Sequence, residues 1–149
     1  MRAVLQRVTR AAVEVDGLVV GRIGLGLVVL LGVAKGDEEE DLCYILDKIL
    51  GLRVFSDQAG KMNRALGEVG GSLLLISQFT LLGDTSSGRR PGFDLAAPAE
   101  AARALYEGAA TRLRAAGVRV ETGRFGTHMQ VELLNDGPVT LILDSRRKA

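Results

Sequence analysis

The segment spanning residues 129–144 constrains the fold of this chain more than any other stretch. Residues 129–133 alternate apolar and polar side chains, which is the period-two pattern of a half-buried strand. Residues 139–143 are almost wholly apolar and partly β-branched, which is typical of a strand covered on both faces. Asn135-Asp136-Gly137-Pro138 lies between them, so the sequence predicts two strands with an interruption.

The interruption at Gly137-Pro138 has two interpretations. Proline fixes its own φ, donates no N–H and pushes the preceding residue out of the helical region, so the dipeptide by itself favours a plain turn. Glycine adds no side chain, however, and leaves the backbone uncovered. The same two residues could therefore present two carbonyl acceptors to a ligand.

Composition limits the class of protein. The chain has 149 residues, 47% of them hydrophobic, and we expect one domain over residues 1–149 with its own core. No apolar run approaches the ~20 residues of a membrane span. With one cysteine, Cys43, and one histidine, His128, a disulfide framework and a Cys-rich or multi-histidine metal site are excluded. We therefore expect a cytoplasmic protein without a cofactor. The net charge of +1 confines any nucleic-acid contact to a local patch.

The N-terminal third predicts a β-meander. Strand-length runs occupy residues 4–9, 12–15 and 18–23, and Asp16-Gly17 is a strong signal for a two-residue hairpin turn. A continuous apolar run at residues 27–33 then predicts a buried strand.

Two helices are expected. The first has Asp37 as its cap and Glu40 in the capping-box position, and Cys43 is expected to be buried or half-buried beside its apolar stripe. The second is rich in alanine and runs from Pro98 in its first turn to about residue 116, where Gly117 ends it.

The remaining segments complete the predicted fold. Further strands are expected at residues 52–55, 72–80 and 118–122, and residues 85–93 form the clearest loop. Together these elements predict the α+β class: a mostly antiparallel sheet, rolled toward a barrel, with two amphipathic helices covering part of it.

A conventional catalytic side-chain system is hard to build from this sequence. Ser77, Thr80 and Ser145 are available, but a Ser-His-Asp triad would need His128, which we interpret as a surface or structural histidine. No paired carboxylates and no phosphate-binding glycine loop are evident. What remains is two polar strand ends, residues 77–80 and 135–138, with Arg89 and Arg90 on a loop as natural phosphate contacts.

Two of these segments resemble the signature motifs of the D-aminoacyl-tRNA deacylases. They are Gly-Gly-Ser-Leu-Leu-Leu-Ile-Ser-Gln-Phe-Thr-Leu at residues 70–81 and Asn-Asp-Gly-Pro-Val-Thr at residues 135–140. The resemblance extends through residues 1–8, 30–37, 47–55 and 123–126, nearly the whole chain. It implies an enzyme that hydrolyses the ester between a D-amino acid and the 3′-terminal adenosine of tRNA.

The resemblance also implies where the active site lies. It implies a homodimer with its sites at the subunit interface, where a cis Gly-Pro peptide of one subunit reaches into the pocket of the other. The catalytic motif carries over to Ser77, Gln78, Phe79 and Thr80. Substrate binding carries over to Gly137, Pro138 and Arg7, and we expect Met129 and Asn135 to join them. We expect Arg89 and Arg90 to contact tRNA.

The expected mechanism needs few side chains. Two rigid carbonyls hold the α-ammonium group so that an L side chain strikes the Gly-Pro backbone, while a D side chain points outward and glycine escapes the filter. The 2′-hydroxyl of the substrate helps to activate or orient water, and backbone N–H groups at Phe79 and Thr80 stabilise the oxyanion. A covalent mechanism with Thr80 as nucleophile is the alternative, although the motif offers no adjacent base. The assistance of a metal stays open.

Two departures and two rival functions accompany the resemblance. Thr127-His128 stands where the family commonly has a small residue and an acid, and Gly92 stands where serine is common, which leaves the tRNA contacts less defined than the chemistry. A nucleic-acid-binding module without catalysis would not need both intact motifs. A serine or threonine hydrolase would act on small esters that lack adenosine.

Overall fold

The strand β1 (Arg2–Val15) organises the sheet, because other strands pair with it along both edges. The computed structural model of the chain describes residues 1–147. The strand β8 (Gln130–Asp144) runs antiparallel along one edge of β1, and β2 (Leu18–Ile23) and β3 (Gly26–Gly32) follow one another along the other edge. The predicted hairpin at Asp16-Gly17 is confirmed, with φ of 51° and 78° at its two residues. The two runs predicted at residues 4–9 and 12–15 are one continuous strand.

The sheet continues from β3 with parallel strands. The strand β6 (Ser72–Ser77) pairs in parallel with β3, and β7 (Val120–Thr122) pairs in parallel with β6. Parallel neighbours need a crossover connection, and here each crossover contains one long helix. The predicted α+β class with a mostly antiparallel, rolled sheet and two helices is confirmed, and the pairings of β3 with β6 and of β6 with β7 make the sheet mixed.

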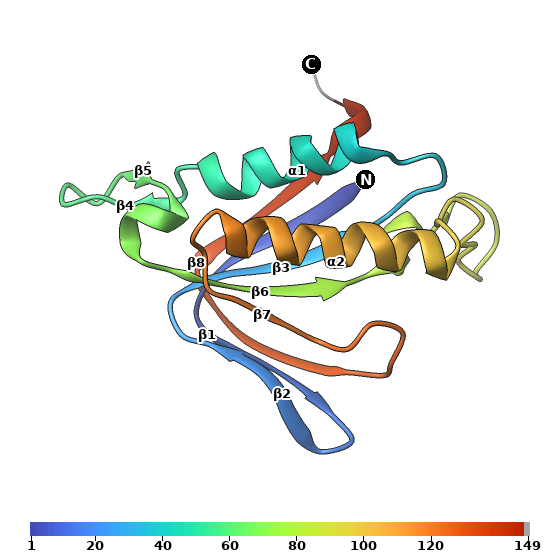
Figure 1. Ribbon diagram of the computed structural model, residues 1–149, viewed down its shortest axis with the longest axis horizontal. Coiled ribbons are helices and arrows are strands. Elements are labelled where there is room, and N and C mark those ends of the chain that lie inside the picture. The colour runs from blue at the N-terminus through green and yellow to red at the C-terminus, as the bar shows by residue number, and fades with distance from the viewer. Residues whose placement is uncertain (148–149) are drawn as a thin grey trace.

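Both long helices lie on the same side of the sheet (Figure 1). They are α1 (Glu39–Gly51) and α2 (Ala99–Ala115), and each buries one apolar stripe. Alternate residues of the buried strands face this side, such as Val29 and Leu75, while Val28 and Leu74 face the other. The runs at β3 and β6 are apolar on both faces because both faces are covered.

The far side of the sheet is covered by its own strands. The register of β1 shifts between Gln6 and Arg10, and the distal part of β1 with β2 folds back until Gly21 lies against the Thr122 carbonyl. A second core of seven buried residues fills this side: Val8, Ala11, Val13, Ile23, Val28, Leu74 and Ile76. This return of the strands gives the sheet its nearly closed, barrel-like form.

The start of α1 differs from the prediction. The N-cap residue of the helix is Glu38 rather than Asp37. The N–H of Glu38 donates to the Asp41 carboxylate at 2.9 Å. Asp37 is buried and instead lies 2.7 Å from the Met1 ammonium group, which also donates to Ser145. Burial alone would raise the pKa of Asp41, but hydrogen bonds from Ser145 and from the Glu38 backbone lower it below its usual value of 3.8. A long-range partner for Asp37 cannot be read from local sequence.

Cys43 was predicted to be buried or half-buried, and this prediction is wrong. The side chain is exposed and accepts a hydrogen bond from Arg112 of α2 at 3.3 Å. The buried stripe of α1 consists of Leu42, Ile45, Leu46 and Ile49, and Cys43 lies outside it.

The C-terminal segment was predicted as two strands, and it forms one. Both halves of β8 pair with β1, and residues 136–139 bulge out between the pairs Gln6–Thr140 and Val8–Asn135. Neither a plain turn nor a hairpin occurs there. Residues 139–143 were expected to be covered on both faces, but in this chain they alternate, and Ile142 is 77% exposed.

Shorter elements complete the chain. The strand β4 (Phe55–Ser56) pairs with β5 (Met62–Arg64), close to the short strand predicted at residues 52–55. Short 3₁₀ helices occur at η1 (Leu66–Val69), η2 (Phe79–Leu82) and η3 (Ser145–Arg147). The strand predicted at residues 72–80 therefore stops at Ser77, and Thr80 lies in a helical turn. Within residues 1–147, no helix is long and apolar enough to cross a membrane.

Candidate active site

A cavity of about 580 Å³ lies between the end of β6, the start of α2 and the loop before β8. Apolar side chains form most of its wall: Val33, Ile76, Phe79, Ala97, Phe125 and Met129. Polar groups enter it from Ser77, Gln78, Thr127 and His128. A cavity of this size, mostly apolar with a few converging polar groups, is the usual form of a small-ligand site.

The Ser77–Thr80 motif forms a sharp bend at the edge of this cavity. The N–H of Gln78 donates to the Leu31 carbonyl at 2.8 Å, which ties the end of β6 to β3. A Cβ added at Gly32 would lie 2.8 Å from the Gln78 carbonyl oxygen, so only glycine allows this approach. The Gln78 amide also donates to Thr80 Oγ1. The motif is thereby fixed by backbone contacts as well as by its own side chains.

The backbone N–H groups of Phe79 and Thr80 stand at the beginning of η2. The first N–H groups of a helix have no acceptor within the helix, so this bend offers donors of the kind that stabilise an oxyanion. Ser77 and Gln78 are half-buried, Phe79 is 54% exposed, and Thr80 is exposed and does not line the cavity.

The loop that carries Arg89 and Arg90 lies beside the exposed ring of Phe79. Its base is closed by backbone hydrogen bonds between Asp84 and Gly92 at 2.7 and 2.9 Å. Phe93 packs edge-on against Phe79, with 5.1 Å between the ring centroids. Both arginines are exposed on this loop and line none of the cavities described here.

The Gly137-Pro138 segment is the exposed tip of the β8 bulge, and its peptide bond is cis. The Asn135 side chain closes the bulge, accepting from Val139 N at 2.8 Å and donating to the Val139 carbonyl at 3.2 Å. Gly137 has a φ of 147°, and a Cβ there would lie 2.8 Å from the Val139 nitrogen. No other residue fits this position without a shift of the backbone.

Arg7 of β1 anchors the same bulge. Its Nε donates to the Asp136 carbonyl at 2.8 Å and its Nη1 to the Val54 carbonyl at 2.7 Å. Arg7 and Asp136 line a different cavity, with Phe55 and Arg64. The 580 Å³ cavity at the Ser77–Thr80 motif and the cavity at Arg7 have no lining residue in common.

One chain therefore holds the predicted residues in separate groups. Ser77, Gln78, Phe79 and Met129 meet around the first cavity. A second group, Arg7, Asn135, Gly137 and Pro138, meets at the bulge. Thr80 follows Phe79 but does not line the cavity, and its hydroxyl accepts a hydrogen bond from the Gln78 amide.

Sequence reasoning missed the loop that completes the cavity. Phe125, Gly126, Thr127 and His128 all line it, and His128 was interpreted only as a surface or structural residue. The imidazole is exposed, as expected of a surface histidine, but it stands at the cavity. The available signal for a loop beside a ligand was the pair Gly123 and Gly126, which enclose residues 124–125 shortly before a predicted strand.

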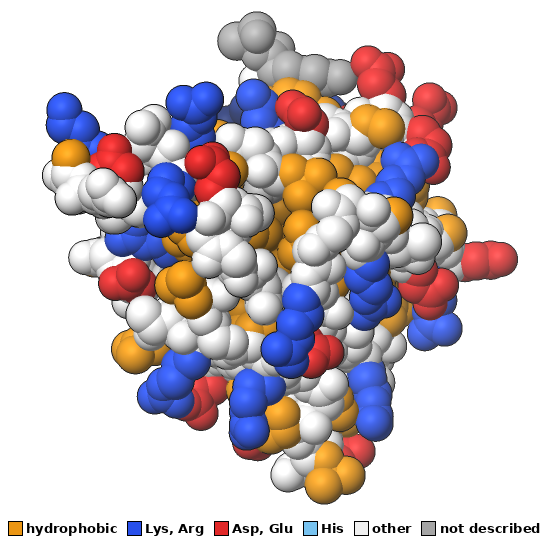
Figure 2. Space-filling view, turned by 60° about the vertical axis from the view of Figure 1, so that its left-hand side comes forward, with side chains coloured by type: hydrophobic (Ala, Val, Ile, Leu, Met, Phe, Trp, Pro, Cys, Tyr) orange, Lys and Arg blue, Asp and Glu red, His pale blue; other side chains and the backbone are white. Residues whose placement is uncertain are grey.

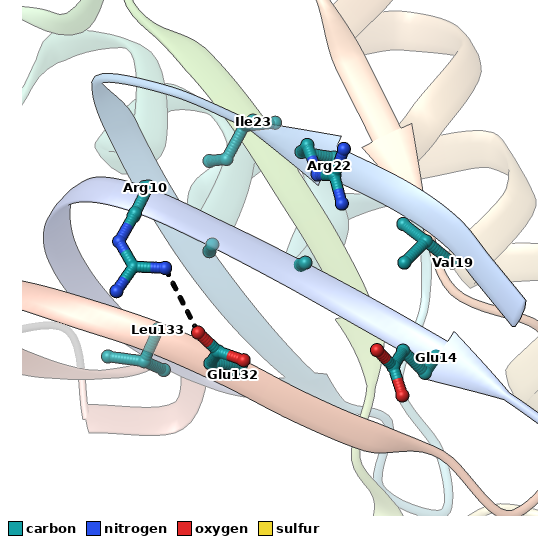
Figure 3. Close-up of a pocket in the computed structure, with 9 residues that line it drawn as sticks. Arg10, Glu14, Val19, Arg22, Ile23, Glu132 and Leu133 are labelled. Atoms are coloured by element: carbon teal, nitrogen blue, oxygen red, sulfur yellow. Dashed lines mark hydrogen bonds and ion pairs between the residues drawn. The ribbon is translucent and has the colours of Figure 1, made fainter. Parts of the chain in front are cut away.

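Two other features are unsuited to the chemistry. A small pocket of about 150 Å³ on the folded-back strands is bordered by the Arg10–Glu132 ion pair at 3.0 Å, and both side chains are exposed (Figure 3). It contains none of the predicted site residues. Behind the main cavity, burial raises the pKa of Tyr106 to about 12, and its hydroxyl donates to the Leu75 carbonyl. This phenol stays protonated at neutral pH.

The fold and the cavity together define a small α+β protein with an enzyme-like ligand site, whose wall is mostly apolar with a few polar groups. The chain belongs to the D-Tyr-tRNA(Tyr) deacylase family, whose model matches residues 4–144. It is accordingly a D-aminoacyl-tRNA deacylase, a hydrolase that acts on an ester bond of aminoacyl-tRNA.

Relatives and solved structures cover almost the whole chain. A D-aminoacyl-tRNA deacylase of Anaeromyxobacter dehalogenans (strain 2CP-C) is 62% identical over 147 residues, which is 99% of each chain. A structure named c-Myc DNA Unwinding Element Binding Protein is 42% identical, with a TM-score of 0.90 over 97% of this chain and 98% of that one. A probable eukaryotic D-amino acid tRNA deacylase shares the fold at 20% identity, with a TM-score of 0.82 over 95% and 97% of the two chains.

Proposed function

We propose that this enzyme selects D-aminoacyl-tRNA with a backbone filter, which Gly137 and Pro138 of one subunit supply to the cavity of another. The observation that carries the proposal is the separation of the two motifs. Ser77, Gln78 and Phe79 line an open cavity, whereas Gly137-Pro138 is an exposed tip elsewhere on the same chain. A homodimer that joins each tip to the partner's cavity completes two equivalent sites.

Exposed apolar side chains support this association. Val131, Leu134 and Ile142 of β8 are 40%, 51% and 77% exposed, and Phe79 beside the cavity is 54% exposed. Exposed large apolar side chains of this kind are common on surfaces that are covered by a partner. The strand β8, which carries the filter, thus also exposes apolar surface that a partner subunit could bury.

The filter works by exclusion. The two carbonyls of the tip accept hydrogen bonds from the substrate's α-ammonium group, and an L side chain then meets the Gly-Pro backbone. A D side chain points toward the open side, so no pocket for a particular side chain is required. Glycine has no side chain to reject, and glycyl-tRNA is therefore a further substrate. Rejection of the wrong stereoisomer by collision gives specificity without side-chain recognition.

The chemistry uses the substrate's own 2′-hydroxyl. It helps to activate or orient water, and the N–H groups of Phe79 and Thr80 stabilise the developing oxyanion. The described hydrogen bond of Thr80 Oγ1 is with the Gln78 amide, which is no base. This contact speaks against Thr80 as an activated nucleophile, since such a residue needs a neighbouring base.

Further contacts extend the proposal to the whole substrate. Arg89 and Arg90 bind phosphates at the acceptor end of the tRNA, and Met129 and Asn135 assist in forming the site, Met129 from the cavity wall and Asn135 by closing the bulge. As an enzyme acting on tRNA, the protein works in the cytoplasm.

The decisive experiment compares hydrolysis of D-Tyr-tRNA, L-Tyr-tRNA and Gly-tRNA by the purified protein. We expect turnover of the D form, near-complete sparing of the L form, and measurable hydrolysis of glycyl-tRNA. Comparable rates on D- and L-Tyr-tRNA would contradict the backbone filter. Binding of tRNA without hydrolysis would favour the nucleic-acid-binding alternative, and rapid cleavage of small esters without adenosine would favour a serine or threonine hydrolase.

A further inference from the structure

We propose that a groove between α2 and the β7–β8 connection binds phosphates of the single-stranded 3′ end of the tRNA. This arginine groove, lined by Arg103, Arg114, Arg124, Phe125 and neighbouring residues, has a volume of about 530 Å³. The proposal rests on tRNA as the substrate and adds a surface distinct from Arg89 and Arg90. It does not depend on the backbone filter.

The charge of the groove favours an anion. Three arginines line it against one acid, Glu107. Among residues 1–147, no carboxylate lies within ion-pairing distance of Arg103, Arg114 or Arg124, whereas Arg112 of the same helix pairs with Glu39. Planar guanidinium groups match phosphate oxygens with two parallel N–H donors. The groove thus collects positive charge that the rest of the described chain does not neutralise.

Other contacts hold this charge in place. Arg114 donates to the Val120 carbonyl at 3.0 Å, which fixes it against the edge strand β7. Arg103 lies over the ring of Phe125, 5.1 Å from its centroid. Thr111 adds a side-chain hydroxyl, which is a common phosphate contact, and the Thr127 hydroxyl donates to the Arg124 carbonyl at 2.9 Å. Two positioned cations in one groove suit a chain of phosphates better than a single small anion.

The groove adjoins the candidate active site. Phe125 and Thr127 line both the groove and the 580 Å³ cavity. A tRNA end whose terminal adenosine enters the cavity can lay its preceding phosphates along α2. On the face shown in Figure 2, basic and acidic side chains are interspersed.

The salt dependence of kcat/KM tests the proposal directly. Each phosphate contact with a single strand contributes about 0.7 to the slope of log affinity against log salt concentration. We expect Arg124→Gln and Arg103→Gln each to reduce the slope for D-Tyr-tRNA by about 0.7 and to raise KM several-fold, with kcat kept. Arg112→Gln removes the same charge from the same helix outside the groove, and it should leave the slope unchanged.

Two further variants separate charge from structure. Glu107→Gln should act in the opposite direction, lowering KM and steepening the slope, because it removes the acid from the groove. Arg103→Lys keeps a cation over Phe125 and should restore most of the slope that Arg103→Gln loses. If Arg103 had only a structural role, Glu107→Gln would not steepen the salt dependence and Arg103→Lys would not restore it.

A minimal substrate distinguishes the outcomes. The D-tyrosyl ester of adenosine has no phosphate, so its hydrolysis should be equal in the wild type and in Arg124→Gln. The groove proposal would be overturned if Arg103→Gln and Arg124→Gln kept the wild-type salt slope on tRNA. It would also be overturned if Arg112→Gln lost as much slope as they do. The backbone filter fails separately, if the wild type hydrolyses the D- and L-tyrosyl esters at equal rates.

Discussion

Arg7 is the residue through which the central strand controls the Gly137-Pro138 tip. Its guanidinium group donates hydrogen bonds to both the Asp136 and the Val54 carbonyls, and the side chain is only 12% exposed. A lysine ammonium is a compact point charge on a flexible stem and cannot reproduce a planar fork that spans two acceptors. Under the proposed function Arg7 is thus a positioning residue, acting on the substrate through the tip that it holds.

We predict that Arg7→Lys lowers kcat on D-Tyr-tRNA about 10- to 100-fold, the effect expected of a small displacement in a preorganised site. The loss of one hydrogen bond should reduce the free energy of unfolding by only about 1–2 kcal/mol. Steady-state kinetics and thermal unfolding measure the two effects. Arg10→Lys is the matched control, because Arg10 lies on the same strand but is 66% exposed. Equal activity in both variants would exclude a positioning role.

Thr80 allows the two catalytic mechanisms to be separated. We predict that Thr80→Val keeps activity within a factor of a few, since its hydroxyl contacts the Gln78 amide and no base. Substrate with a 2′-deoxy terminal adenosine should react roughly 10²- to 10⁴-fold more slowly, the range typical of general acid–base assistance. Single-turnover rates with both substrates measure this. Loss of turnover in Thr80→Val together with normal reaction of the deoxy substrate would establish the covalent alternative.

At the scale of elements, the parallel contact between β3 and β6 brings the Ser77–Thr80 motif to the edge of the cavity. At Gly26 the two strands leave no room for a side chain, because an added Cβ would lie 1.7 Å from the Ser72 carbonyl oxygen. Gly32 at the other end of β3 permits the bend at Gln78 in the same way. Two glycines in one strand thus determine where β6 lies and where it ends.

We predict that Gly26→Ala lowers the free energy of unfolding by at least about 3 kcal/mol or prevents folding, because a backbone atom blocks the methyl group. Gly51→Ala at the end of α1 meets no atom within 4 Å and should stabilise the protein by about 0.5–1 kcal/mol. Urea unfolding of the two variants gives both values. A mild effect of Gly26→Ala would mean that β3 and β6 can separate at little cost.

At the scale of the whole molecule, the proposed function requires two subunits for each complete site. We predict that an inactive Pro138→Ala chain and an inactive Gln78→Ala chain regain activity when they are mixed and allowed to exchange. In a mixed dimer both lesions fall in one site and leave the other intact. About half of the dimers in a random mixture are mixed, so activity should approach roughly a quarter of wild type.

The same mixture has a clear contrary outcome. If each subunit completes its own site, no combination of the two chains is active. Size-exclusion chromatography at the assay concentration supplies the control, because the mixed dimer can form only if the chain dimerises at all.

Local sequence was sufficient for several features of this protein. The Asp16-Gly17 turn, the apolar stripes of both helices and the loop at residues 85–93 each follow from neighbouring residues alone. The signature motifs at residues 70–81 and 135–140 likewise identified the family, which the match over residues 4–144 confirmed. Periodicity and turn chemistry act over a few residues, so no distant partner is needed to predict them.

Only the tertiary structure decided how these pieces are combined. Both halves of β8 bind the same strand, which converts an expected turn into a bulge, and Asp37 takes the Met1 ammonium as its partner instead of capping α1. The cavity joins residues 77–79 to residues 125–131, and Gly137-Pro138 lies apart from it. Such arrangements depend on contacts between residues far apart in the chain, and a register or a partner of that kind leaves no local pattern in the sequence.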